Sequence, residues 1–407
     1  MNSVTAHAHT TKPLTARAPG AARVVFRLLQ QLRHGSLTLH LPDDSVQTVG
    51  DGHGPHVSLI LHNWKPFEAA LKSGDIGFAE SYIGSDWTTS HLPTLLHLLS
   101  TNRQVLDDVI HGSWWGRLAF RLRHLLNRNT RHKSRKNIQA HYDLGNAFYR
   151  LWLDGTMNYS SGLFLGDYQQ DMRQAQHAKV ERALNMAGVQ HGHRVLEIGC
   201  GWGALAEKAV QEFGAHVTGV TLSTEQLVWA QERLASQGLS GLADLRLQDY
   251  RDIADGPFDA ICSIEMLEAV GQEYWSTYFQ SIARLLKPMG RACIQSIVIR
   301  DDLFDHYVRS TDFIQQYIFP GGCLPCPREF KREATEAGLR VVDEFHFGRD
   351  YAETCRRWRA EFLARQTEVL ELGFDERFIR IWDFYLAYCE AGFESGDIDV
   401  VQYTLGR

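Results

Sequence analysis

The sequence predicts an α/β protein whose main part is a mostly parallel, Rossmann-like sheet, preceded by a small α+β domain. Three observations predict this fold. Strand-like and helix-like segments alternate from about residue 137 onward, a glycine-rich turn follows the first of these strands, and 407 residues are too many for one ordinary domain. Hydrophobic residues at 44% and charged residues at 22% exclude wholesale disorder. A net charge of −6 disfavours a dedicated nucleic-acid binder.

The N-terminal residues and the cysteines indicate the cellular compartment. Residues 1–20 have no periodic apolar face and no apolar secretory core, so we expect a disordered tail. No stretch approaches the ~20 consecutive apolar residues that a membrane-spanning helix needs. Seven scattered cysteines favour reduced thiols over a disulfide framework, and nothing completes a zinc site around Cys323 and Cys326, so we expect no metal. These features predict a cytoplasmic protein.

Residues 21–110 are predicted to form the small α+β domain. Its strands show period-two alternation or a short apolar run, and its helices carry apolar residues at helical spacing. A glycine is expected to stop the first helix. In order, the predicted elements are the strands SLTLHL and VSLILH and the helices WKPFEAALKSG and HLPTLLHLLS. This segment contains no obvious catalytic constellation.

Residues 111–136 are predicted to form a basic linker helix. Between residues 117 and 136 there are eight Lys or Arg and no acid, and Trp114 and Trp115 lie just upstream. The spacing of apolar and basic residues places them on two faces of one helix. Such a helix can lie on an anionic bilayer, gaining up to about 1 kcal/mol per basic residue near the headgroups. The alternative is a solvated helix between two domains.

Residues 137–407 are predicted to form the Rossmann-like domain. The predicted strands are HRVLEIGCG, AHVTGVTLS, LADLRLQDY, FDAICSIEM and RACIQSIVI, and the predicted helices are ALAEKAVQEFG, TEQLVWAQERLASQG and EYWSTYFQSIARLLKP. Strand–helix alternation at this spacing implies right-handed crossovers and parallel strands. A ligand site is therefore expected at the carboxyl ends of the strands.

The first strand–helix turn predicts which ligand binds there. Its glycines Gly199, Gly201 and Gly203 alternate behind the acid Glu197. This differs from the G-x-G-x-x-G turn on which a dinucleotide pyrophosphate rests. A carboxylate here suits a cationic ligand such as S-adenosylmethionine (SAM), and the next strand ends in VTLS without the ribose-binding acid of NAD enzymes. Glycine-rich turns also occur without any cofactor.

Six segments, in order, resemble the cyclopropane fatty acid synthase family of SAM-dependent methyltransferases, which includes the mycolic acid cyclopropane synthases. They are HYDLGNAFYRLWLDGTMNYSSGLF, VLEIGCGWGALA, GVTLSTEQ, SIEMLEAVG, QQYIFPGGCLP and YLAYCEAGF. The resemblance extends from about residue 25 to the end. It implies a class I methyltransferase fold with an N-terminal accessory lipid-binding domain. It also implies methyl transfer to the cis double bond of an unsaturated fatty acyl chain of a membrane phospholipid, ending in a cyclopropane ring.

The resemblance further implies the site residues. Its SAM contacts fall on Tyr159, Ser160, Gly199, Gly201, Thr221, Gln226, Asp249 and Tyr250. The family also binds bicarbonate at the reaction centre, and those contacts fall on Ser161, Glu268, Gln295, the backbone of Ile297, and Tyr351.

Three positions depart from the familiar family pattern. Ser161 replaces a Cys, Ala269 replaces the His after Glu268, and Gln295 replaces a His. Gln295 keeps a hydrogen-bond donor but cannot carry a proton. Such departures resemble a subgroup that makes methylene or methyl-branched fatty acids, the latter with a separate reductase. Both products therefore remain alternatives to the cyclopropane.

The chemistry requires a dry site and a base. Methyl addition to an alkene leaves a carbocation that water would capture, and aromatic faces can stabilise it. The candidate rings are Tyr317, Phe319, Phe148 and Tyr149, with ordinary core packing as the alternative explanation. Proton loss from the added methyl then closes the ring. Glu268, helped by Tyr351, is the predicted base or its positioner, and Glu265 is the competing acid.

Two further functions remain open, and the partners follow from the main hypothesis. A small-molecule N- or O-methyltransferase would need no basic linker, and an inactive lipid-binding homologue would keep the fold alone. As partners we expect a phospholipid bilayer surface, with the protein peripheral on the inner membrane face, and a second copy of the chain in a homodimer. We expect no nucleic acid.

Overall fold

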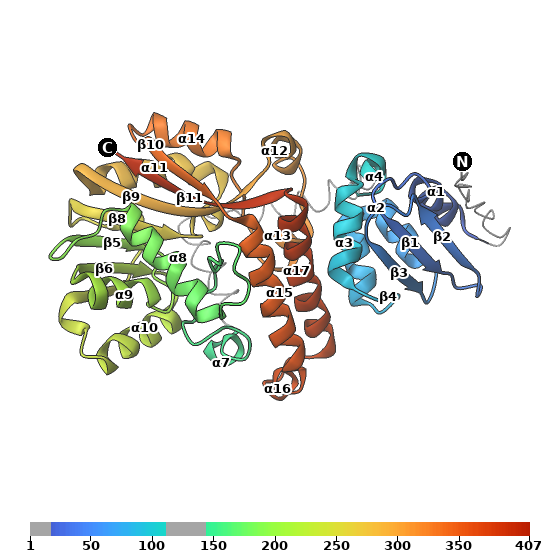
Figure 1. The fold of residues 1–407 in the computed structure, drawn as a ribbon, viewed down its shortest axis with the longest axis horizontal. Helices are drawn as coiled ribbons and strands as arrows, with labels where there is room; N and C mark the ends of the chain where they lie inside the picture. Colours follow the sequence, from blue (N-terminus) through green and yellow to red (C-terminus); the bar gives the residue numbers. More distant parts are fainter. Residues whose placement is uncertain (1–17, 111–143) are drawn as a thin grey trace, which may run out of the picture. The chain divides into compact units, whose positions relative to one another are not determined.

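The computed structural model describes residues 18–110 and 144–407, and the chain divides into two compact units, Met1–Ala119 and Phe120–Arg407 (Figure 1). Nearly all of the predicted tail and the whole basic segment from residue 117 to 136 lie outside the described residues. Within the described residues, no helix is both long and apolar enough to cross a membrane.

The N-terminal unit is a four-stranded sheet with helices. The strand order is β2-β1-β3-β4, with β1 antiparallel to β2 and parallel to β3. The strands are β1 (Ser36–His40), β2 (Val46–Gly50), β3 (His56–Leu61) and β4 (Trp87–Thr89), and the helices are α1 (Gly20–Leu29), α2 (Lys65–Ile83), α3 (Leu92–Thr101) and α4 (Arg103–Ile110). Both predicted strands and both predicted helices are present. The predicted glycine stop is also present, since Gly74 is non-helical (φ 60°, ψ −135°) and interrupts α2, and a second helical stretch follows it to Ile83.

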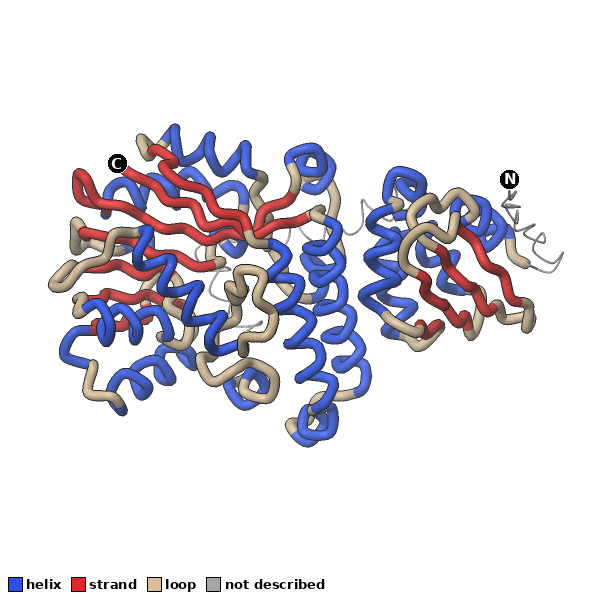
Figure 2. The backbone as a smooth tube through the Cα atoms, in the orientation of Figure 1, coloured by secondary structure: helices blue, strands red, loops and turns tan. Residues whose placement is uncertain are grey.

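The second unit is built on a seven-stranded sheet in the order β10-β11-β9-β8-β5-β6-β7 (Figure 2). The predicted strands form its parallel part, since β5 pairs in parallel with β6 and β8, β6 with β7, and β8 with β9. Two antiparallel strands complete it on the β9 side. The strands are β5 (Arg194–Ile198), β6 (His216–Thr221), β7 (Ala243–Leu247), β8 (Phe258–Ile264), β9 (Leu286–Ile299), β10 (Arg340–His346) and β11 (Ile398–Gly406).

Helices cover both faces of this sheet, as its parallel strands require. One buried cluster contains Val180 of α8 (Met172–Met186), Leu205 of α9 (Ala204–Phe213) and Ala230 of α10 (Thr224–Ser236). Phe279 and Phe330 from α11 (Trp275–Leu285) and α14 (Pro327–Glu336) belong to the cluster on the other face. Strands with both faces covered are rich in apolar residues, as in β8 (FDAICSI), where five of the seven side chains are buried.

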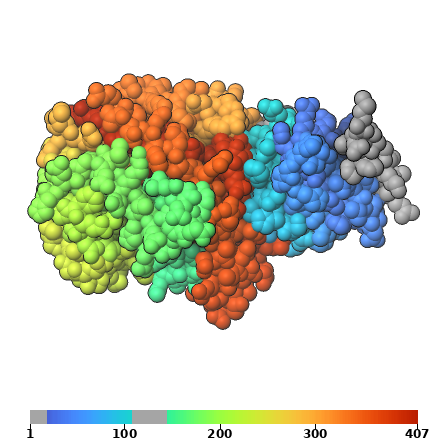
Figure 3. Space-filling view, in the orientation of Figure 1, coloured from blue at the N-terminus to red at the C-terminus, as the bar shows by residue number. Residues whose placement is uncertain are grey.

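The C-terminal helices are joined to the segment before α8. Helices α15 (Gly348–Ala364) and α17 (Glu376–Ser395) lie side by side, with α16 (Gln366–Glu371) between them in sequence. The backbone N–H groups of Phe164 and Leu165 donate to Asp350 of α15 at 2.7 and 3.0 Å. In Figure 3 the surface of residues 144–190 (green) accordingly adjoins that of α15–α17 (orange to red). The described part of the unit also contains the short α-helices α7 (Asn146–Tyr149), α12 (Asp301–Tyr307) and α13 (Phe313–Tyr317).

Candidate active site

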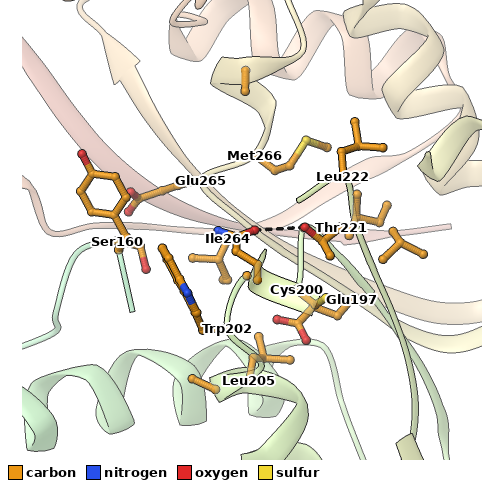
Figure 4. A pocket seen from close by; sticks show the side chains of 18 of the residues that line it. Ser160, Glu197, Cys200, Trp202, Leu205, Thr221, Leu222, Ile264, Glu265 and Met266 are labelled. Carbon is orange, nitrogen blue, oxygen red and sulfur yellow. Dashed lines mark hydrogen bonds between the residues drawn. The ribbon is translucent and has the colours of Figure 1, made fainter. Parts of the chain in front are cut away.

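A pocket opens at the carboxyl ends of β5, β6 and β8, where a parallel sheet is expected to hold its ligand (Figure 4). All nine residues predicted to bind the cofactor line it: Tyr159, Ser160, Glu197, Gly199, Gly201, Thr221, Gln226, Asp249 and Tyr250. The segment before α8 supplies the first two, and Gln226 lies in the first turn of the helix Thr224–Ser236. The strand ends and the segments directly after them supply the others.

The glycine loop gives this pocket its floor. After β5 ends at Ile198, Gly199 takes φ +83°, and a Cβ built there would lie 2.9 Å from Cγ of Met266. Gly203 also has φ +83°, and its Cβ would lie 2.9 Å from that of Ala230. Side chains rarely adopt this backbone conformation, and neither position has room for one. The loop therefore brings backbone atoms directly to the pocket, as the sequence predicted.

Glu197 provides a buried carboxylate for a cationic ligand. Its side chain is 4% exposed, and its Oε2 has no hydrogen-bond partner. Burial raises the pKa of Glu197 to about 8, against the opposing charge of Lys179. A buried acceptor without a partner is costly unless a ligand completes it. Without a ligand, the carboxyl is therefore mostly protonated at neutral pH, and a bound ammonium group would favour its anion. The ammonium group of SAM fits this position, so the residues present fit that cofactor.

Sequence reasoning missed Lys179. This residue of α8 is fully buried and lines the pocket, where its Nζ donates to Oγ of Ser160 at 2.6 Å. Burial lowers the pKa of Lys179 to about 8, and the charge of Glu265 is the largest influence opposing this. Buried lysines are rare in proteins unless they are paired. The signal available in the sequence was a Lys within a helix stretch whose neighbours, Ala175 and Val180, are apolar core residues.

The reaction-centre residues gather around Glu265 rather than Glu268. Oε1 of Glu265 accepts hydrogen bonds from the backbone N–H of Ser161 at 3.0 Å and from Nε2 of Gln295 at 2.7 Å. Its Oε2 accepts from the hydroxyl of Tyr351 at 2.6 Å. Glu265 follows directly on β8 and has φ +50°. This left-handed conformation costs about 1–2 kcal/mol in a residue with a Cβ and is unusual at a non-glycine position.

Glu268 occupies a separate position. Its Oε1 accepts from the backbone N–H of Ile297 and from Oγ of Ser296, the latter at 3.2 Å, while its Oε2 has no partner. Burial first, and the charge of Glu265 second, raise the pKa of Glu268 to about 8. Burial also raises the pKa of Glu265, but the hydrogen bonds from Tyr351 and Ser161 and the charge of Lys179 oppose that rise.

The structure therefore corrects the predicted arrangement. The five residues Ser161, Glu268, Gln295, Ile297 and Tyr351 were expected to surround one bicarbonate, with Glu268 either positioning that ion as the base or acting as the base itself. Instead, three of them donate to the carboxylate of Glu265, and Ile297 donates to Glu268. Because the protein's own carboxylates accept these hydrogen bonds, the donors present do not fit a bicarbonate ion as well. Glu265 is the acid that the sequence named as the competitor of Glu268.

The four aromatic candidates separate into two pairs. None of the four lines the described pocket, but Phe319 and Tyr149 pack against its lining residue Tyr159, with ring centroids 6.4 and 5.4 Å from that ring. Phe148 is instead packed among other buried rings, with Trp382 at 5.1 Å, and Tyr317 stacks on Phe313 at 5.3 Å. Phe148 and Tyr317 therefore follow the alternative explanation of ordinary packing. A ring that the sequence did not single out, Tyr385 of α17, meets Tyr159 through their hydroxyls at 2.7 Å.

Comparison with known proteins shows which family this chain resembles. A family model described as mycolic acid cyclopropane synthetase matches residues 129–403. A tuberculostearic acid methyltransferase of Mycobacterium tuberculosis is 38% identical over 401 residues, covering 96% of this chain and 92% of the relative. A cyclopropane-fatty-acyl-phospholipid synthase of Escherichia coli is 33% identical over 342 residues, covering 84% and 85%. A mycolic acid cyclopropane synthase crystallised with SAH and CTAB superposes with a TM-score of 0.63 at 32% identity, over 67% of this chain and 98% of that one.

Proposed function

The chain belongs to the mycolic acid cyclopropane synthetase family of SAM-dependent methyltransferases, and from that premise we propose that it methylates the cis double bond of an unsaturated acyl chain carried by a membrane phospholipid. SAM supplies an electrophilic methyl group on a positively charged sulfur. The observation that carries the proposal is the buried carboxylate of Glu265, which three donors hold in the wall of the cofactor pocket.

The two neighbouring carboxyls have different tasks. At neutral pH Glu268, with its pKa raised to about 8, is mostly protonated and neutral. Glu265 accepts three hydrogen bonds and lies near the Lys179 ammonium, which favour its anion. Carboxyl pairs whose environments separate their pKa values in this way divide acid and base roles between them. Glu265 is therefore the base, and Glu268 stays neutral beside it.

The protein's contribution to the reaction follows from this assignment. An alkene is a poor nucleophile, so its placement in line with the methyl group is essential, and good placement contributes on the order of 7–11 kcal/mol. A C–C bond forms as the C–S bond breaks, leaving a cation on the other alkene carbon. The Glu265 anion stabilises that cation electrostatically and then takes a proton from the transferred methyl group. Closure of the C–C bond gives the cyclopropane.

A second product has specific support. Replacement of a His by Gln295 and the name of the tuberculostearic acid methyltransferase favour an open-chain product. For that product, a hydride moves from the methylated carbon to the neighbouring cation, and proton loss from the methyl group then leaves a methylene group. Both products gain one CH₂ and both need the same base. A methyl-branched acid would require a separate reductase afterwards. The choice between them therefore leaves the proposed transfer step unchanged.

The phospholipid substrate has two supports. The E. coli relative is named for a fatty-acyl phospholipid, and the basic segment from residue 117 to 136 suits an anionic bilayer. We propose peripheral attachment to the membrane surface through this segment.

The test uses the full-length protein, SAM with a labelled methyl group, and phospholipid vesicles that carry cis-monounsaturated chains. We expect label in the acyl chains and a mass gain of one CH₂ by mass spectrometry. A cyclopropane resists mild hydrogenation, whereas a methylene group takes up hydrogen. Vesicles with saturated chains are the control. Label that enters small amines or alcohols but not the lipid would replace the proposal by the small-molecule alternative.

A further inference from the structure

The orientation of the Gln295 side-chain amide decides how the base behaves. Its N–H end donates to Oε1 of Glu265 at 2.7 Å. A flipped amide would present its carbonyl oxygen instead, which favours a protonated Glu265. Such flips exchange atoms of nearly equal size, so the shape of the site does not select one orientation. The selection must come from whatever binds the other end of the amide.

That other end is bound by Gln402 of β11. Gln402 and Gln295 are register partners on the adjacent strands β11 and β9, and both are fully buried. Nε2 of Gln402 donates to Oε1 of Gln295 at 3.0 Å and to the backbone carbonyl of Lys179 at 3.2 Å. Nη1 of Arg182 donates to Oε1 of Gln402 at 2.8 Å.

The polarity of this chain of hydrogen bonds is fixed at both of its outer ends. A guanidinium such as that of Arg182 can only donate, and a backbone carbonyl such as that of Lys179 can only accept. Gln402 must therefore point its oxygen at Arg182 and its nitrogen at Lys179. The same nitrogen then faces Gln295, whose oxygen must accept, and the N–H end of Gln295 is left for Glu265.

We propose that Gln402 is a positioning residue that fixes the amide of Gln295 with its N–H toward Glu265, and so holds the base as an anion. Gln402 contacts Gln295 and acts on Glu265 only through it. The inference deepens the proposed function, because it rests on Glu265 being the base. Five other titratable groups interact electrostatically with Glu265. They come from α8, α15, α17 and the turn after β8, and they are Lys179, Tyr351, Cys355, Cys389 and Glu268. A Gln402 variant replaces none of these five side chains.

The first test is the pH dependence of kcat in Gln402→Met, a neutral variant of similar length. We expect the rise of kcat with pH to move upward by about one pH unit, so that the variant is about tenfold slower on the acidic side and recovers on the alkaline side. SAM affinity should not change. Thr404→Val is the matched control, because Thr404 is buried two residues along the same strand and its Oγ1 has no partner. Its profile should match that of the wild type.

A double-variant cycle tests the route through Gln295. Gln295→Met should move the profile in the same direction, and adding Gln402→Met should move it no further. Equal slowing at every pH, or two shifts that add, would overturn the proposal. If Gln402→Met does not fold, Gln402→Asn is used, which keeps the amide but shortens the side chain by one methylene. The pH profile of kcat should move upward in this variant too. An unmoved profile in Gln402→Asn would also overturn the proposal.

Infrared difference spectroscopy provides a measurement without turnover. The band of the protonated Glu265 carboxyl is identified by its loss in Glu265→Gln, and in Gln402→Met it should persist to higher pH. An unchanged titration of this band would overturn the inference even in a protein that methylates lipid. Absence of lipid methylation in the wild type, with the band shifted as expected, would instead overturn the proposed function alone.

Discussion

The substitutions Glu265→Gln and Glu268→Gln distinguish the roles of two carboxyls that lie three positions apart. The amide in Glu265→Gln keeps the shape of the side chain. Its oxygen can accept from the backbone N–H of Ser161 and from Gln295, and its N–H₂ can donate to the hydroxyl of Tyr351, which can turn to accept. The site should therefore stay folded while losing its anion and its base.

The magnitudes follow from the protonation states. Removing a positioned general base costs about 10²–10⁴-fold in rate, or about 3–5 kcal/mol of activation free energy. Glu268 has its pKa raised to about 8 and is already mostly neutral at pH 7, so a neutral amide resembles the form that is present. We therefore expect Glu268→Gln to lose less than about tenfold in kcat.

The assay is single-turnover methyl transfer into unsaturated phospholipid at pH 7, with SAM affinity measured separately by calorimetry. Affinity for SAM should change little in both variants, since Glu197 and the glycine loop hold the cofactor side of the pocket. A larger loss of kcat in Glu268→Gln than in Glu265→Gln would refute the assignment of Glu265 as the base. Equal loss of kcat and of SAM affinity in Glu265→Gln would also refute it, because a base is not needed for cofactor binding.

Three other outcomes are expected. Glu197→Gln should weaken SAM binding by about tenfold to a hundredfold in calorimetry, because a hydrogen bond to a charged group contributes about 1.5–3 kcal/mol; an unchanged affinity would remove Glu197 from the ammonium site. The melting temperature of the ligand-free protein should fall as the pH rises from about 5 to about 8. Folding raises the pKa of Glu268 from 4.5 to about 8, so in this range the unfolded chain releases a proton that the folded chain retains. Glu268→Gln should flatten this decline, and an equally steep decline would contradict the raised pKa. Neutralising the basic residues between 117 and 136 should weaken vesicle binding, most visibly at low salt, in a sedimentation assay; binding that does not change would favour the solvated-helix alternative.

Local patterns were sufficient to predict much of the fold. The apolar runs of β5, β6 and β8, and the helices between them, lie where the sequence placed them, because strands buried on both faces are rich in apolar residues. The glycine loop was predictable for the same kind of reason, since only glycine fits the positive φ and the close approach at Gly199. The sequence also predicted the stop at Gly74, whose positive φ interrupts α2, but it did not predict the second helical stretch after it, whose Ile76 and Ala79 are buried.

The sequence alone determined the fold class, the cofactor loop and the two candidate acids. These features depend on periodicity, on glycine geometry and on motifs that are contiguous in the chain. Only the tertiary structure decided which acid is the base, because that depends on donors that arrive from distant elements and on the left-handed turn at Glu265 that brings its carboxylate to them. The pairing of Gln295 with Gln402 has the same origin. The two residues are 107 positions apart and become neighbours only when β11 is added beside β9.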